Sequence, residues 1–194
     1  KIHFELADYI YFSQICISII SLIQAKNILL LGDGSGVNAA LINENIQQDI
    51  KLTHVDLAQY LLMQYIVNYK WKDKSKYVFA ENFTKTNICN IDLIINMDSF
   101  PEMTSKEVEK YVKFVKVQNI KYILSYNHKI IEDRHSNFRR FFLEAGMCTV
   151  ISYESSIRKG WFVELFKLNV KDVVVAYPNI TRDNFTVESE KDDR

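Results

Sequence analysis

The chain has 194 residues, of which 48% are hydrophobic, 25% charged and 13% aromatic. This globular composition excludes a wholly disordered chain, a collagen and a simple coiled coil, and the length suits one sizeable domain. The 24 basic and 24 acidic side chains cancel, so net charge gives no reason to expect a nucleic-acid or anionic-lipid partner. Three widely spaced cysteines without a Cys-x-x-Cys motif argue against disulfides or a zinc site, and they favour a reducing, cytoplasmic location.

The first predicted element is a helix over residues 1–26, in which the stretch 9–25 carries no charge. Gln14, Ser18 and Ser21 recur at helical spacing, and the uninterrupted apolar run falls short of the ~20 residues that a membrane span needs. We therefore expect no membrane span but an amphipathic, mostly buried helix, packed on the main domain or over its ligand cleft. No signal-peptide layout is visible.

The next elements alternate between strand and helix. In order, the sequence predicts a strand over 27–31, a helix over 37–47, a strand over 52–57, a helix over 58–72, and strands over 77–80 and 91–96. The runs NILLL and IDLIIN are almost wholly apolar, which is typical of strands buried on both faces. The helix over 58–72 carries Leu61, Leu62, Tyr65, Ile66 and Tyr69 on one side.

The second half contains the clearest helix signal. Thr104 and Glu107 make a capping box, and apolar residues follow from Val108 at helical spacing. After it we expect a strand over 121–125, a helix with Phe138 on its apolar face that stops at Gly146, and two strands over 148–153 and 161–168. A charged loop joins the last two strands, which therefore read as a hairpin.

This order predicts an α/β fold in one main domain. Alternating strands and helices imply right-handed crossovers and a mostly parallel seven-stranded sheet with helices on both faces, ending in a C-terminal antiparallel hairpin. The expected division is a helical appendage over 1–26, the main domain over 27–170 and a C-terminal extension over 171–194 with a frayed end. Ligands of such sheets bind beyond the carboxyl ends of the strands.

Three of the five glycines lie directly after the first strand, in Gly32-Asp33-Gly34-Ser35-Gly36. Small residues there let the backbone pass close to a ligand, and the next helix offers free N–H groups. The dinucleotide pattern G-x-G-x-x-G is not met, because its sixth position is Val37. The segment predicts a nucleotide-like ligand, with a plain tight turn as the alternative.

Asp56 ends the second predicted strand, 20 residues beyond Gly36. An acidic side chain at this position can accept hydrogen bonds from both hydroxyls of a ribose. The alternative is a surface aspartate that caps the next helix.

The segment after the fourth strand, Asn96-Met97-Asp98-Ser99-Phe100-Pro101-Glu102-Met103, is the most distinctive. The G-x-G-x-G form resembles motif I of the class I S-adenosylmethionine-dependent methyltransferases. The N-x-x-S-F-x-E-M pattern, with Ser125-Tyr126-Asn127 at the end of the fifth strand, resembles the sugar O-methyltransferases of bacterial surface-polysaccharide clusters. The likeness runs from about Asn27 to Leu168.

The resemblance implies a Rossmann-like class I methyltransferase fold, S-adenosyl-L-methionine as cofactor, and a small acceptor such as a sugar or nucleotide-sugar. Within that family the loop after the third strand usually reads the adenine amino group, which here falls to Glu81 or Asn82. The implied cofactor-binding residues are Gly32, Asp33, Gly34, Gly36, Asp56, Leu57, Glu81, Asn82 and Asn96. The implied acceptor-binding residues are Asp98, Ser99, Tyr126 and Asn127.

Methyl transfer to a hydroxyl also needs a proton acceptor. His128 is a candidate because an ordinary histidine titrates near neutral pH, and Glu102 is a candidate because it matches the family motif. Asp98 is the third candidate. His128 could instead be a solvated loop residue, and Glu102 could only cap the helix that begins near Thr104.

Other interpretations stay open. Asp98 could bind a divalent cation, but no further carboxylates stand at convincing spacing, so no metal site is predicted. Lys70, Lys72, Lys74 and Lys76 could touch phosphates, but a solvated helix end is the preferred explanation. Residues 96–99 lack the prolines of the nucleic-acid amino-methyltransferases. The two alternative functions are a catalytically idle, methyltransferase-like binding module and a methyltransferase for another acceptor class.

Overall fold

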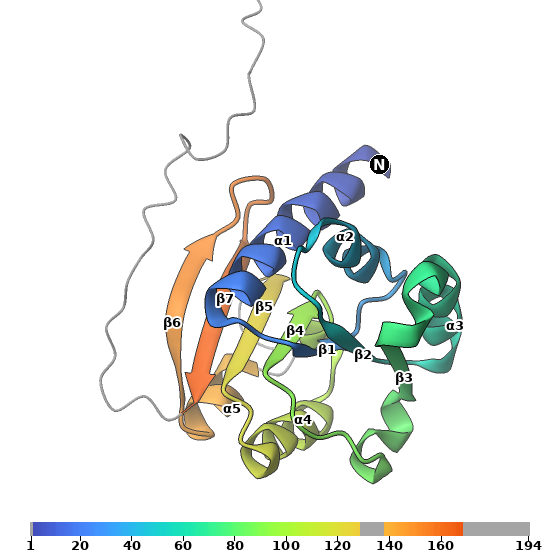
Figure 1. The fold of residues 1–194 in the computed structure, drawn as a ribbon. Helices are drawn as coiled ribbons and strands as arrows, with labels where there is room; N and C mark the ends of the chain where they lie inside the picture. The colour runs from blue at the N-terminus through green and yellow to red at the C-terminus, as the bar shows by residue number, and fades with distance from the viewer. Residues whose placement is uncertain (1, 129–137, 169–194) are drawn as a thin grey trace, which may run out of the picture.

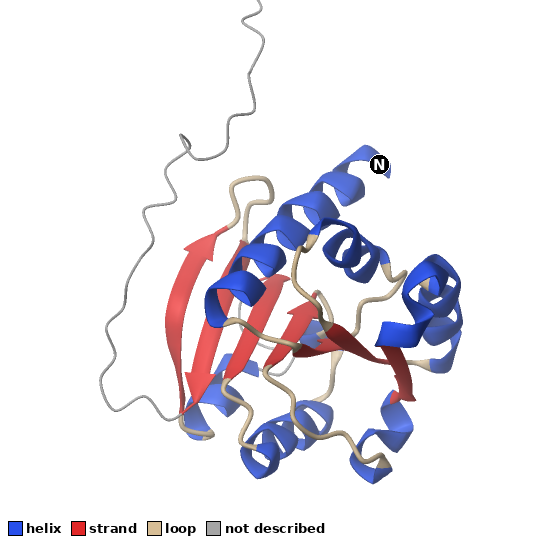
Figure 2. Cartoon of the chain, in the orientation of Figure 1, coloured by secondary structure: helices blue, strands red, loops and turns tan. Residues whose placement is uncertain are grey.

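The structure is a computed structural model that describes residues 2–128 and 138–168. A single sheet of seven strands runs through these residues, with helices on both of its faces (Figures 1 and 2). The α-helices are α1 (Ile2–Ile23), α2 (Val37–Asn45), α3 (Ala58–Val67), α4 (Ser105–Gln118) and α5 (Phe138–Glu144). The strands are β1 (Asn27–Leu31), β2 (Lys51–Asp56), β3 (Ser75–Phe79), β4 (Leu93–Met97), β5 (Tyr122–His128), β6 (Met147–Glu154) and β7 (Trp161–Leu168).

The strand order is β3-β2-β1-β4-β5-β7-β6. The first five strands pair in parallel, whereas β7 lies antiparallel between β5 and β6. The order reverses at β1, because β2 and β4 flank it on opposite sides. The predicted mostly parallel, seven-stranded sheet with a C-terminal hairpin is confirmed, including all seven strands.

Alternate residues of each inner strand face opposite sides of the sheet and fill two separate cores. In β1, Ile28 and Leu30 join the core under α1 and α2, whereas Leu29 and Leu31 join the core under α4 and α5. Both sets are almost fully buried. This burial on both faces is why the run NILLL is continuously apolar.

The N-terminal helix α1 packs against the sheet and α2 (Figure 1). Phe12, Cys16 and Ile20 are fully buried, whereas Gln14 and Ser18 are exposed. The helix packs on the core as expected, but it is not mostly buried, because only 39% of Leu6–Ile23 is buried and Leu22 is exposed. Within the described residues, α1 is also the one helix whose length and composition would allow a membrane crossing, over Leu6–Ile23.

The region after β2 differs from the sequence prediction. The expected continuous helix over 58–72 ends at Val67, and a 3-10 helix, η1 (Tyr69–Lys74), follows it. The side of α3 named from the sequence mostly faces outward, because Leu61 is buried but Leu62 and Ile66 are exposed. The buried residues of α3 are Leu61 and the polar Gln64, and the residue that caps its C-terminal end, Asn68, is polar and buried as well.

Two further 3-10 helices complete the described chain. η2 (Ala80–Lys85) follows β3, and η3 (Phe100–Glu102) follows β4. β5 extends to His128 instead of ending at Ser125. The predicted C-terminal extension over 171–194 lies outside the described residues.

Candidate functional site

A cavity of about 580 Å³ opens at the carboxyl ends of the parallel strands. Residues that follow β1, β2, β3 and β4 line it, together with side chains from both ends of the chain. The lining residues are Asp8, Tyr9, Leu31, Gly32, Asp33, Gly34, Ser35, Asn38, Val55, Asp56, Leu57, Tyr60, Ala80, Met97, Asp98, Ser99, Glu102, Met103, Glu107, Tyr111 and Arg158. The cavity therefore lies where the fold predicted a ligand, beside the reversal in strand order.

The glycine loop forms one wall of the cavity. Gly32, Gly34 and Gly36 all have positive φ angles, of 70°, 55° and 83°. A Cβ on Gly32 would clash with Ser99, and a Cβ on Gly36 would approach Asn68 Nδ2 to 2.9 Å. Nothing lies within 4 Å of the corresponding position on Gly34. The loop therefore packs tightly at its two ends and leaves open space at its centre, beside the cavity.

Asp56 is tied to this loop. Its Oδ2 atom accepts hydrogen bonds from the Gly34 N–H at 3.0 Å and from Gln64 Nε2 at 2.7 Å, and its Oδ1 accepts from the Leu57 N–H at 2.8 Å. Burial nevertheless raises the pKa of Asp56 above its ordinary value. Because a carboxylate has about four acceptor positions, Oδ1 keeps capacity for one more donor, whereas Oδ2 is fully used.

The buried polar face of α3 holds the loop from behind. Gln64 Nε2 also lies 3.1 Å from the Gly34 carbonyl, and Asn68 Nδ2 donates to the Gly36 carbonyl at 3.0 Å. Both side chains are fully buried. The polar inner face of α3 is thus explained by its contacts with the glycine loop.

Asp33 is a buried acidic group in the cavity wall. Its Oδ2 accepts from the Ala39 N–H at 3.2 Å, whereas its Oδ1 has no hydrogen-bond partner among the described residues. Burial raises the pKa of Asp33 to about 7. A buried carboxylate oxygen without a partner favours a cationic or hydrogen-donating ligand group beside it.

Asn96, Ser99 and Asn127 form a buried network beneath the loop. Asn96 Nδ2 donates to the Leu31 carbonyl at 2.8 Å and also contacts Ser99 Oγ. Asn127 Nδ2 donates to Asn96 Oδ1 at 2.9 Å. Asn96 and Asn127 are fully buried and lie outside the cavity lining, so here they join β1, β4 and β5.

Asp98 lies in the cavity directly after β4. Its φ angle of 55° is left-handed, and its N–H donates to the Tyr126 carbonyl at 2.9 Å. Burial raises the pKa of Asp98 to about 6, with Arg158 lowering it and the nearby Glu102 and Asp8 carboxyls raising it. The predicted residues Asp98, Ser99 and Glu102 are thus brought together in one wall.

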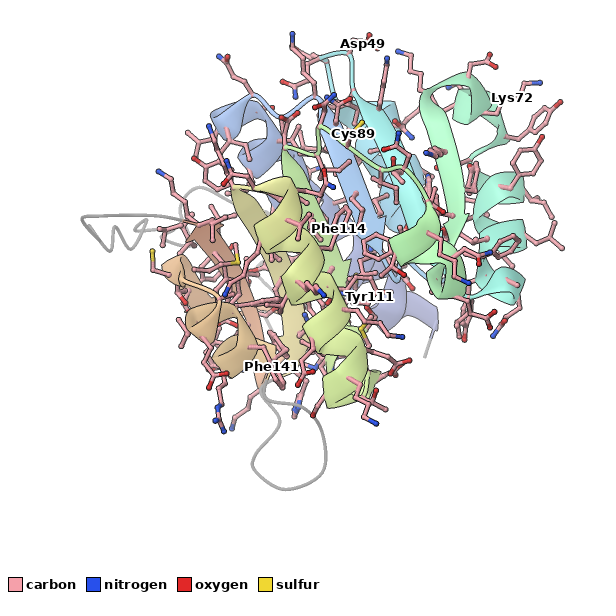
Figure 3. The ribbon with its side chains drawn as sticks, turned by 90° about the horizontal axis from the view of Figure 1, so that it is seen from below. Asp49, Lys72, Cys89, Tyr111, Phe114 and Phe141 are labelled. Carbon is pink, nitrogen blue, oxygen red and sulfur yellow. The ribbon has the colours of Figure 1, made fainter. Side chains whose placement is uncertain are left out.

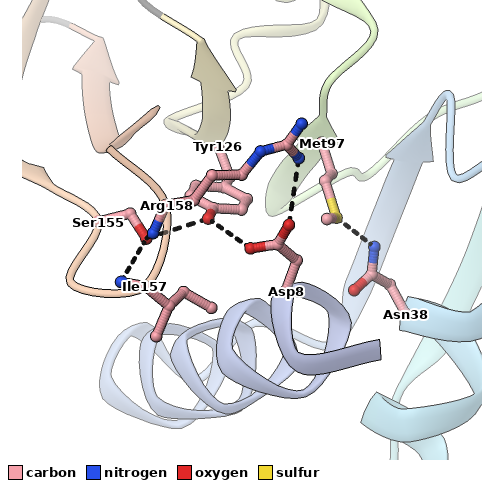
Figure 4. Close-up of polar contacts among 7 residues, drawn as sticks. All are labelled: Asp8, Asn38, Met97, Tyr126, Ser155, Ile157 and Arg158. Carbon is pink, nitrogen blue, oxygen red and sulfur yellow. Dashed lines mark hydrogen bonds and ion pairs between the residues drawn. The ribbon is translucent and has the colours of Figure 1, made fainter. Parts of the chain in front are cut away.

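Close to Asp98, the cavity wall joins the N-terminal helix α1 to the loop between β6 and β7 (Figure 4). Arg158 Nη1 lies 3.1 Å from Asp8 Oδ2, and the guanidinium stacks 3.5 Å from the Trp161 ring centroid. Tyr126 donates its hydroxyl hydrogen to Asp8 Oδ1 at 3.2 Å and lies 3.0 Å from Ser155 Oγ. Burial raises the pKa of Tyr126, so this hydroxyl stays protonated at neutral pH. α1 and the β6–β7 loop are thereby held together over the cavity.

Several predicted site residues lie elsewhere. His128 is exposed at the end of β5, beside Trp161 and Gly160, and does not line the cavity. Tyr126 is buried behind the cavity wall. Glu81 and Asn82 are exposed on η2, and their neighbour Ala80 lines the cavity instead.

Sequence reasoning missed Asp8, Tyr9 and Arg158. They come from elements about 150 residues apart, so no local pattern connects them. The one available signal was Asp8 itself, an acidic side chain directly before the uncharged stretch 9–25. Across the described residues, no group of three or more His, Cys, Asp or Glu side chains is placed to hold a metal ion.

None of the protein-family models matches this sequence, and neither does any curated protein. Solved structures do match. A candidate O-methyltransferase from Klebsiella pneumoniae superposes with a TM-score of 0.63 at 16% identity, over 82% of this chain and 80% of that one. The O-methyltransferase from Bacillus cereus in complex with S-adenosylhomocysteine gives a TM-score of 0.62 at 11% identity, over 81% of this chain and 80% of that one.

An O-methyltransferase family protein from Burkholderia thailandensis gives a TM-score of 0.61 at 13% identity, over 84% of this chain. The match spans only 58% of that longer protein. Identities this low relate folds and not activities. The chain has the Rossmann-like fold of the class I methyltransferases.

Proposed function

We propose that the protein is an S-adenosylmethionine-dependent methyltransferase that methylates a hydroxyl oxygen of a small polar acceptor. The observation that carries this proposal is the joined glycine loop and Asp56 in the wall of a cavity at the carboxyl edge of this fold. The structural similarity to O-methyltransferases supports the same reaction class.

The residues present fit this cofactor. The open space at Gly34 leaves room for a group close to the backbone, and the unused acceptor position on Asp56 Oδ1 suits one ribose hydroxyl. The unpartnered Oδ1 of Asp33 suits the ammonium of the methionine part. Leu57 and Tyr60 add apolar surface for the adenine ring. When bound, the cofactor supplies an electrophilic methyl group.

We infer that Asp98 takes the acceptor's hydroxyl proton. It lies in the cavity, and its pKa of about 6 leaves it ionised at neutral pH and still more basic than an ordinary aspartate. Glu102 is the second candidate, because it lines the same wall. His128 is third, since it lies outside the cavity lining in this structure.

A sugar or nucleotide-sugar is the acceptor class that we put forward. Asp8, Asp98 and Glu102 offer carboxylate oxygens that can accept hydrogen bonds from several hydroxyls, and Arg158 can donate to further oxygens. The measurement is a panel of nucleotide-sugars incubated with S-adenosylmethionine, with detection of S-adenosylhomocysteine and of a product heavier by one methyl group.

Calorimetric titration with S-adenosylhomocysteine tests the cofactor assignment directly. We expect Asp56→Ala to weaken binding by roughly 1.5–3 kcal/mol, because charge-assisted hydrogen bonds are lost. Gly34→Val should be worse, because the side chain enters the open space and strains a left-handed backbone. Leu143→Ala, at an exposed position of α5, is the control variant and should bind normally. An absence of heat with the unaltered protein would favour the idle binding module.

A further inference from the structure

The outer face of α3 is an exposed apolar surface that the proposed function does not use. We define it as Leu62, Met63, Tyr65, Ile66, Val67 and Tyr69, which are between 40% and 64% exposed. The chain carries no charge from Leu57 to Tyr69. A surface helix normally turns its apolar side inward, but α3 buries Gln64 and Asn68 against the glycine loop and exposes aliphatic and aromatic side chains.

A row of lysines follows this face directly. Lys70, Lys72, Lys74 and Lys76 alternate along η1 and β3, and Lys72 lies at the outer edge of the molecule beyond α3 (Figure 3). Lys70 and Lys74 form exposed ion pairs with Glu44 and Asp49, and Lys76 donates to the Asn87 carbonyl at 3.1 Å. Water screens such exposed pairs, so they add little stability and these lysines can exchange partners. Lys72 contacts the ring of Tyr69 at 4.4 Å and has no carboxylate partner among the described residues.

We propose that the outer face of α3 and the lysine row dock this protein on the surface of an anionic lipid bilayer, without crossing it. Exposed aliphatic side chains with tyrosine, a nearby tryptophan and flanking lysines are the combination that lies at the boundary between lipid headgroups and acyl chains. The whole chain has no net charge, so the attraction depends on the local row and not on the total.

A second copy of the chain fits this surface less well. Packing two α3 faces symmetrically would add a second lysine row to the same contact, whereas anionic headgroups neutralise the row. Docking would also bring the cavity close to the lipid, because Leu57 and Tyr60 line the cavity and are exposed beside this face.

Cosedimentation with lipid vesicles tests the proposal. The full chain should bind vesicles of phosphatidylcholine mixed with phosphatidylserine, bind those of phosphatidylcholine alone much more weakly, and dissociate as salt is raised. Ile66→Asp should reduce binding by about tenfold or more, and Lys72→Glu by several-fold. Val117→Asp is the matched control, because Val117 is equally exposed but lies on α4, and it should bind as the unaltered protein does.

Thermal unfolding checks that each variant is folded. We expect all of them to fold, because the substituted side chains are exposed. Equal binding by the Ile66→Asp variant and the unaltered protein would overturn the proposal, as would an absence of binding to either kind of vesicle. A dimer in light scattering that Ile66→Asp dissociates, together with no vesicle binding, would assign the face to a second copy instead. These readouts do not depend on methyltransferase activity.

Discussion

At the scale of single residues, Asp56 shows how a ligand-binding group is prepared. Its Oδ2 atom already holds the Gly34 N–H and the Gln64 amide, so only Oδ1 has room for a ligand hydroxyl. The sequence-based expectation that Asp56 binds both ribose hydroxyls therefore requires Oδ2 to release a donor. Gln64 sets this arrangement, because it contacts Asp56 and the Gly34 carbonyl at once.

Gln64 should accordingly act as a positioning residue for the cofactor. We expect Gln64→Leu to weaken S-adenosylhomocysteine binding by about fivefold, the equivalent of one hydrogen bond of about 1 kcal/mol. The variant should also discriminate less well between S-adenosylhomocysteine and its 2′-deoxyribose analogue, because Asp56 is no longer oriented. Gln64→Glu should bind more weakly still, since it places a second carboxylate against Asp56. An unchanged preference between the two ligands in Gln64→Leu would contradict the positioning role.

The proposed role of Asp98 as the proton acceptor can be tested by kinetics. If it is the base, kcat/KM should fall as pH drops through about 6, because the protonated carboxyl cannot accept a proton. Asp98→Asn should lower turnover by 10²–10⁴-fold, or about 3–5 kcal/mol, and leave cofactor binding intact. Glu102→Gln and His128→Ala are the comparisons. Loss of turnover in one of these and not in Asp98→Asn would move the role to that residue.

At the scale of secondary-structure elements, the capping box at the start of α4 is predicted from the sequence and is present in the structure. Thr104 Oγ1 accepts the Glu107 N–H at 3.3 Å, and Glu107 Oε2 accepts the Thr104 N–H at 2.7 Å. Tyr111 and Phe114 of this helix both pack on Phe83 of η2. Because the cap also fixes Glu107 and Tyr111 at the cavity, the start of α4 shapes the site.

Loss of this cap should therefore be measurable. Thr104→Ala removes one side of the reciprocal pair and should lower the free energy of unfolding by about 1 kcal/mol. The expected fall in Tm is about 2–4 °C for a chain of this size. Urea unfolding gives the free energy directly, and Thr104→Ser, which keeps the hydroxyl, should restore most of it. Equal losses in both variants would show that the Thr104 methyl group matters, and not the cap.

At the scale of the whole molecule, two buried titratable groups oppose each other in the pH dependence of stability. Burial raises the pKa of Asp33 to about 7 and lowers the pKa of His54 to about 4. His54 is fully buried, stacks on Tyr77, and has no partner for either ring nitrogen among the described residues. Both groups are therefore neutral in the folded protein near pH 5–6.

The two groups act in opposite directions between about pH 4 and 7. The folded state holds the Asp33 proton more tightly than the unfolded chain, so this contribution is lost as pH rises from 4 to 7. As pH falls, His54 is protonated at a higher pH in the unfolded chain than in the folded protein. Its contribution to stability is therefore lost as pH falls from 6.5 to 4. Each contribution amounts to a few kcal/mol and largely offsets the other.

Substituting one of the two residues should reveal the pH dependence of stability that the other one causes. Asp33→Asn should be more stable than the unaltered protein at pH 8, and its stability should fall steeply as pH drops below 6.5. His54→Phe, which can keep the stack on Tyr77, should instead lose stability as pH rises from 4 to 7. Urea titrations at several pH values measure both slopes. Parallel pH profiles for both variants and the unaltered protein would rule out these two residues as the source.

The sequence by itself determined the seven strands and most of the helices, in their order along the chain, because hydrophobic periodicity, capping residues and glycines act over a few neighbouring residues. NILLL, the capping box at Thr104 and the glycine loop were all readable in this way. Only the tertiary structure decided which face of α3 is buried. Leu62 and Ile66 have the same apolar character as Leu61, but contacts with the glycine loop select Gln64 and Asn68 for the interior.

The tertiary structure also decided which polar residues meet in the cavity. Asp8 and Arg158 lie 150 positions apart and carry no mark of their pairing in the sequence, because contacts across the sheet depend on strand order and helix placement. Asp98 follows β4 and lines the cavity, whereas His128 is the last residue of β5 and does not. β5 continues two residues beyond Tyr126, the partner of Met97 at the end of β4, and stays paired with β7 there. Side-chain direction at a strand end depends on exact strand length, which local pattern does not determine.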